Sequence, residues 1–173
     1  KVNGFSWDMK SWNFSGKRYP PPGSREYEFK LDNAIVFNTG SNDAELVQGW
    51  GWSPPEKNFT WTNGKMASLV FPIEAPEQDL ILTVKLHPFI VPGKLDHQQV
   101  NVIINDKPID QWLFSEGGQQ EKTILIPKDL LSQGKLNIVF ETPDAKSPKE
   151  LGISEDAREL AIAIYSMTMN VDR

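Results

Sequence analysis

A chain of 173 residues with 39% hydrophobic residues is large enough to bury one sizeable core, and we expect a single domain. Its net charge of −5 and its scattered lysines and arginines exclude nucleic acid as a partner, because nucleic-acid binding depends on clustered positive charge. The absence of cysteine excludes disulfides, thiolate metal sites and a cysteine nucleophile, and no apolar run is long enough to span a membrane.

Residues 1–25 form an aromatic and proline-rich segment that carries Trp7, Trp12, Phe14 and Tyr19. The spacing of these rings lacks a helical period, and their number is unusual for a free tail, so we expect the segment to pack on the domain. It could instead pack on a neighbouring domain outside this chain. Because the sequence begins at Lys1, we expect it to be part of a longer protein that carries any membrane anchor.

Residues 26–173 are dominated by short runs in which apolar and polar residues alternate, the pattern of half-buried strands. The runs that we interpret as strands are 27–31, 34–37, 66–71, 80–86, 100–104, 109–114, 123–126, 136–140 and 160–171. Turn residues separate them, and residues 128–133 have room for one helical turn at most. We therefore predict an all-β fold of about nine or ten strands, a two-sheet antiparallel sandwich resembling a jelly roll. The long last run is expected near the centre of a sheet or beside the first strands.

The segment 45–73 contains three of the six tryptophans and precedes one of these strands. Trp61 alternates with Phe59 and comes directly before a turn, so we expect it to face the core. Trp50 and Trp52 are flanked by Gly49, Gly51 and Pro54, on backbone that can bulge outward, and an exposed indole there could stack on a sugar. The alternative is that these rings also pack inward.

The order of motifs in this chain resembles the β-sandwich domains appended to bacterial membrane glycosyltransferases and to phosphoglycerol-transferase-like enzymes of the cell envelope. The residues that carry the resemblance are Glu45, Gly49, Trp50, Phe59, Thr60, Trp61, Thr62, Gly64, Lys65 and Ala67, then Ser147, Pro148, Glu150, Leu151, Gly152, Ser154, Asp156, Arg158, Leu160, Ile162 and Ile164. The resemblance covers about residues 34–171. Where the related pattern has a glycine after the leucine, this chain has Ala161. The resemblance implies an accessory domain in an extracytoplasmic setting, periplasmic or at the cell surface, within a membrane-anchored protein.

The residues that could support catalysis or metal binding are few. His87 and His97 lie beside loop residues without a nucleophile motif, which argues against a serine hydrolase. Oxygen atoms of the turn that comprises Asn38, Ser41, Asn42 and Asp43 could bind structural calcium, although a plain turn explains the same residues. We expect no other cofactor. Glu45, Glu56 and Glu150 are the candidate carboxylates for glycoside hydrolysis, but a trio of this kind is unavoidable among 23 acidic residues.

Asp156 and Arg158 are two residues apart, so on an extended chain they face the same side. We interpret them as an ion pair that fixes the preceding loop, with Glu45 or a backbone carbonyl as a further partner. The alternative is that Arg158 binds an acidic sugar or a phosphoglycerol group, because a guanidinium suits both anions.

Together these patterns predict a noncatalytic accessory module that binds or positions saccharide for an enzyme of envelope glycans. The ligand-binding residues expected are Trp50, Trp52, Glu45 and Arg158, with Trp61 and Asp156 as structural residues. The alternative is a structural or protein-interaction domain that docks on its parent membrane enzyme.

Overall fold

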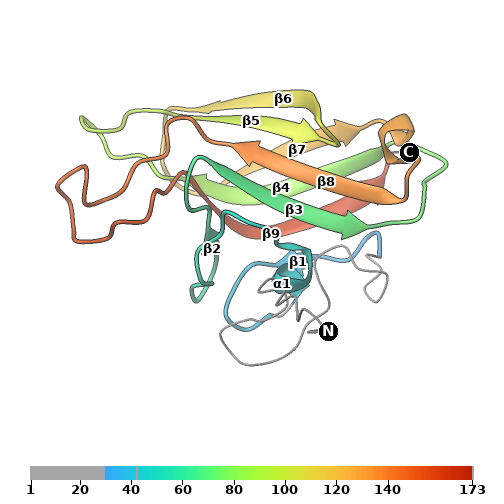
Figure 1. The fold of residues 1–173 in the computed structure, drawn as a ribbon, viewed down its shortest axis with the longest axis horizontal. Coiled ribbons are helices and arrows are strands. Elements are labelled where there is room, and N and C mark those ends of the chain that lie inside the picture. Colours follow the sequence, from blue (N-terminus) through green and yellow to red (C-terminus); the bar gives the residue numbers. More distant parts are fainter. Residues whose placement is uncertain (1–29, 42, 173) are drawn as a thin grey trace, which may run out of the picture.

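Nine strands form two antiparallel sheets in the computed structural model, which describes residues 30–41 and 43–172 (Figure 1). The five-stranded sheet has the order β1–β9–β4–β7, with β2 also pairing with β9, and its strands are β1 (Ile35–Val36), β2 (Thr60–Trp61), β4 (Leu80–Pro88), β7 (Gln120–Ile126) and β9 (Ile162–Val171). The four-stranded sheet has the order β3–β8–β5–β6, and its strands are β3 (Met66–Pro72), β5 (Gln98–Ile104), β6 (Lys107–Phe114) and β8 (Lys135–Glu141). The predicted two-sheet antiparallel sandwich is confirmed.

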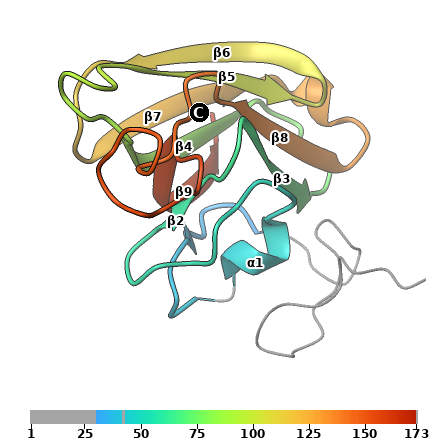
Figure 2. The same cartoon turned by 60° about the vertical axis from the view of Figure 1, so that its left-hand side comes forward.

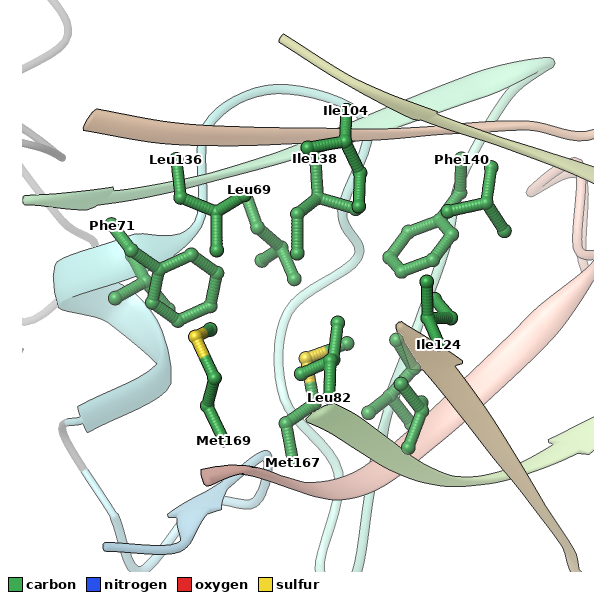
Figure 3. Close-up of a cluster of buried hydrophobic side chains, with 14 of the residues drawn as sticks. Leu69, Phe71, Leu82, Ile104, Ile124, Leu136, Ile138, Phe140, Met167 and Met169 are labelled. Atoms are coloured by element: carbon green, nitrogen blue, oxygen red, sulfur yellow. The ribbon is translucent and has the colours of Figure 1, made fainter. Parts of the chain in front are cut away.

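The core lies between the sheets and is built from every second residue of the long strands. In β4 the residues Leu80, Leu82, Val84 and Leu86 are fully buried, and β8 contributes its own alternate residues. Figure 3 shows the side chains of both sheets pointing toward one another, with Phe140 and Ile138 opposite Leu82, Met167 and Ile124. Because side chains alternate across a strand, the residues between these positions form the two outer faces of the sandwich.

The last strand, β9, lies inside its sheet as the sequence predicted. It pairs along one side with β4 and along the other with β1 and β2, which come from the first described part of the chain. A bulge at Lys85 and Leu86 shifts the β4–β9 register by one residue. The last strand therefore holds the first two described strands in place.

Two short helices complete the described part of the chain. The 3₁₀ helix η2 (Lys128–Leu131) is the single turn that the sequence allowed. The helix α1 (Asp43–Val47) was not predicted, since residues 38–43 are interpreted from the sequence as a turn leading to the aromatic stretch. With five residues, α1 is too short to show a period, and it is held because Ala44 and Val47 are buried in the core and α1 contacts β1 and β3. Figure 2 shows α1 beside β3.

The predicted N-terminal segment, residues 1–25, lies outside the described residues. So do Tyr27 and Phe29 of the first expected strand, while Leu31 of that run lies in a turn. In residues 30–41 and 43–172, no helix has both the length and the apolar character that crossing a membrane requires.

Candidate functional site

Trp50 lies at the β3 edge of the four-stranded sheet, with half of its surface exposed. Its amide N–H donates to the Ser68 hydroxyl at 3.1 Å, and its carbonyl oxygen accepts from the Ser68 N–H at 2.9 Å. Gly51 then turns the chain with a φ of 84°, where a Cβ would lie 2.1 Å from the Met66 carbonyl oxygen. Hydrogen bonds of the Trp50 backbone thus hold this residue at the sheet edge with its indole exposed.

Trp52 and Trp61 are placed differently from Trp50. The Trp52 ring packs against Phe37 with centroids 5.7 Å apart, and its Nε1–H donates to the Ser68 carbonyl at 2.8 Å. The outward position expected for Trp52 is therefore wrong, because Phe37 offers the ring an apolar contact and the Ser68 carbonyl of β3 accepts from the indole N–H. Trp61 is 8% exposed and lies edge-on to Phe59.

The guanidinium of Arg158 donates hydrogen bonds to two carboxylates. Its Nε donates to both carboxylate oxygens of Asp156 at 3.0 and 3.1 Å, and its Nη2 donates to the same group at 2.6 Å. Its Nη1 donates to Glu56 at 3.2 Å. These hydrogen bonds lower the pKa of Asp156 and raise the pKa of Arg158. The further partner is thus Glu56 and not the Glu45 of the sequence interpretation, and no net positive charge remains to attract an anion.

Two of the three candidate carboxylates, Glu56 and Glu150, form ion pairs with different cations. Glu56 pairs with Arg158, whereas Glu150 pairs with Lys146, whose hydrogen bond lowers the pKa of Glu150. Glu45 is partly buried on α1. The arrangement offers no support for a pair of catalytic carboxylates.

Two side-chain oxygen atoms of the turn that could bind calcium accept hydrogen bonds from the backbone of the turn itself. The Asn38 side-chain oxygen accepts from the Gly40 N–H at 3.0 Å, and the Ser41 hydroxyl accepts from the Asp43 N–H at 3.2 Å. Among the described residues, no three acidic or histidine side chains gather as metal ligands.

The outer face of the four-stranded sheet carries a row of hydrogen-bonded amides that the sequence analysis missed. Asn101 on β5 lies directly opposite Gln111 on β6 and opposite Glu141 on β8. The Asn101 amide nitrogen donates to Glu141 at 2.7 Å, and its oxygen accepts from Gln111 at 2.8 Å and from Gln99 at 3.0 Å. We call Gln99, Asn101, Gln111 and Glu141 the amide row.

The amide row borders a hollow on this face of about 610 Å³. The residues that line the hollow are Asn101, Ile103, Pro108, Ile109, Asp110, Gln111 and Glu141. Glu141 also lies opposite Met66 on β3, so the row continues across the sheet toward the edge that holds Trp50. At strand spacings of about 4.8 Å, the span from Gln111 to Met66 is about 14 Å.

The sequence held part of the signal for this row. Gln99 and Asn101 alternate with Val100 and Val102, which marks them as one polar face of a strand. Their alignment with Gln111 depends on the β5–β6 register, which contains a bulge after Val102. Local alternation therefore could not show which polar residues would meet.

No protein-family model and no curated protein sequence matches this chain. Solved structures do match it in fold. One is a family GH115 4-O-methyl-α-glucuronidase with specificity for decorated arabinogalactans, with a TM-score of 0.53 at 11% identity, over 91% of this chain and 19% of that protein.

Two smaller structures match almost over their whole length. The CBM36-1 domain of a multidomain xylanase from the hindgut metagenome of Trinervitermes trinervoides has a TM-score of 0.48 at 10% identity, over 82% of this chain and 99% of that domain. A carbohydrate-binding module CBM36 in complex with calcium and xylotriose has a TM-score of 0.46 at 9% identity, over 80% and 99%. At 9 to 11% identity, these matches are likenesses of fold alone.

Proposed function

We propose that this chain is a noncatalytic accessory module that binds saccharide on the outer face of its four-stranded sheet. The observation that carries the proposal is the amide row, in which Asn101 is fixed by three side-chain hydrogen bonds beside a hollow of about 610 Å³. An ordered set of polar groups in a concave surface is the usual requirement for a small-ligand site.

The chemistry of the row suits sugar hydroxyl groups, which both donate and accept hydrogen bonds. Within the described part of the chain, the amide oxygens of Gln99 and Gln111 and the second oxygen of Glu141 receive no hydrogen bond. These atoms can accept from a ligand, while the bonds that Asn101 makes hold them in place. Because the side chains are already ordered, binding costs less conformational entropy.

Trp50 gives the same sheet an aromatic group at its β3 edge. Half of its surface is exposed, and its backbone is held by two bonds to Ser68. An exposed indole provides a flat apolar surface for the C–H face of a sugar ring. Of the two loop tryptophans proposed from the sequence, Trp50 thus remains a candidate and Trp52 does not.

The wider setting that we propose is an envelope-glycan enzyme with this chain as its accessory domain, outside the cytoplasm. The motif resemblance supports that setting, and the chain is similar in fold to 19% of a glucuronidase, the size of one domain in a larger enzyme. The separate pairing of Glu56 and Glu150 supports a noncatalytic domain.

A glycan array followed by calorimetric titration tests the proposal. We expect the chain to bind at least one neutral oligosaccharide, and Asn101→Ala to weaken that binding by about tenfold or more, since it removes three hydrogen bonds from the row. The matched control is Asn58→Ala, an exposed amide in the loop before β2. Equal losses in both variants, or no binding to any glycan, would contradict the proposal.

A docking domain is the second candidate function, and one observation favours it. Leu113 on β6 is 67% exposed and Leu125 on β7 is 51% exposed, and these strands are the edges of the two sheets. Exposed leucines on edge strands are typical of surfaces that meet another protein. If Leu113→Ser and Leu125→Ser abolish association with the parent enzyme and no glycan binds, docking is the function.

A further inference from the structure

The geometry points to a site that selects against anionic saccharides, an inference that rests on the proposed function and names the ligand class of the same face. Carboxylates lie along the amide row. Glu141 accepts from Asn101 at 2.7 Å, and Asp144 accepts from the Gln99 N–H at 2.9 Å. Asp110 borders the hollow and lies beside Gln111.

These carboxylates are held where they are by N–H donors. Asp110 accepts from the Gln111 N–H and from the Trp112 indole, each at 2.8 Å. Because their donors come from the sheet itself, the negative charges cannot swing away from an incoming ligand without losing hydrogen bonds. Hydrogen bonds of the strands therefore fix the negative electrostatic potential at the hollow.

The described residues that line the hollow include no lysine or arginine. Lys65 donates to the carbonyl oxygens of Pro143 and Ala145. His97 lies 3.7 Å from Asp144 and is 62% exposed, and it carries charge only when protonated.

Arg158, the one arginine in the described ranges, cannot serve as an anion site either. Asp156 and Glu56 take its Nε, Nη1 and Nη2 donors. Within residues 30–41 and 43–172, an acidic sugar therefore finds no open guanidinium fork, although that fork was the group from which the sequence suggested an acidic ligand.

The open groups on the row are the amide oxygens of Gln99 and Gln111 and the second oxygen of Glu141, which accept, and the second N–H of each carboxamide, which donates. Hydroxyl groups match both kinds, whereas a carboxylate, sulfate or phosphate on the sugar cannot donate to the acceptors and adds repulsion from Glu141 and Asp110. Near a protein surface, like charges about 6 Å apart repel strongly enough to weaken binding by about tenfold or more, and salt reduces the effect.

The test uses hexasaccharides of β-1,4-linked glucose, mannose and galactose, each compared with the same chain oxidised at C6 to carboxylates. We expect every oxidised hexasaccharide to bind at least about tenfold more weakly than its neutral parent at low salt. Glu141→Gln should narrow that ratio without abolishing binding of the neutral parent, because glutamine keeps the shape of the side chain. Glu121→Gln, the same charge change on β7 of the other sheet, should leave the ratio unchanged.

The outcomes separate the two proposals. Equal or tighter binding of the oxidised chains overturns the selectivity and leaves saccharide binding intact. An unchanged ratio in Glu141→Gln also overturns it, because the discrimination would then come from elsewhere. If neither form binds, the proposed function fails and the selectivity fails with it.

Discussion

Replacing Arg158 with alanine should destabilise the domain and leave glycan binding intact. The change removes the hydrogen bonds to Asp156 and Glu56 and leaves two carboxylates without a cation. Because Glu56 and Arg158 are 102 residues apart in the sequence, the bond between them ties the loop before β2 to the segment before β9.

The size of the effect follows from the exposure of the three groups. The side chains of Asp156, Arg158 and Glu56 are 29%, 32% and 40% exposed, so solvent screens the network in part. An exposed pair contributes at most about 1 kcal/mol, whereas breaking a buried pair costs about 3 to 5 kcal/mol. A value between these, about 2 kcal/mol, corresponds to a fall in Tm of about 4 to 8 °C for a chain of this size.

Thermal unfolding followed by circular dichroism measures the effect. Arg158→Lys should recover only part of the loss, because an ammonium cannot bond Asp156 and Glu56 in the same fork. The control is Lys146→Ala, which breaks an exposed pair with Glu150 and should change Tm by less than about 2 °C. An unchanged melting curve for Arg158→Ala, together with lost glycan binding, would refute the structural assignment.

Three further predictions concern the aromatic residues and the turns. Trp61→Ala should lower the free energy of unfolding by about 3 to 5 kcal/mol, because it truncates a large buried side chain. Trp50→Ala should leave Tm almost unchanged and weaken glycan binding. Scanning calorimetry measures the first two effects, and titration with glycan measures the third. Burial lowers the pKa of His87, so the folded state favours the neutral imidazole. The stability that depends on His87 should be full above about pH 6.5 and fall as the pH drops toward the folded-state pKa. His87→Phe should flatten this pH dependence of Tm in melts between about pH 5 and 8. Gly51→Ala would put a Cβ 2.1 Å from a β3 carbonyl and should cost more than Gly64→Ala, which meets nothing within 4 Å, so equal denaturant midpoints would contradict this reasoning.

The strands could be predicted from the sequence because alternation is a local property. Leu80, Leu82, Val84 and Leu86 are separated by more polar or exposed positions, and this pattern alone gives a half-buried strand wherever the strand is placed. The burial of Trp61 does not follow from alternation, because its neighbour Thr60 is also buried and Trp61 packs in a second cluster with Leu160 and Ala163. Helix α1 could not be predicted, because five residues contain little more than one turn and tertiary contacts of Val47 hold it.

What only the tertiary structure decided is which residues meet. Asn101 touches Gln111 and Glu141 because the strand order β8–β5–β6 and its register align them, and Arg158 meets Glu56 because the loop before β2 passes beside it. Register depends on how the sheets close over a shared core and on bulges such as the one after Val102. Alternation along one strand does not contain that information, so the sequence determined the sandwich and the tertiary structure determined its candidate site.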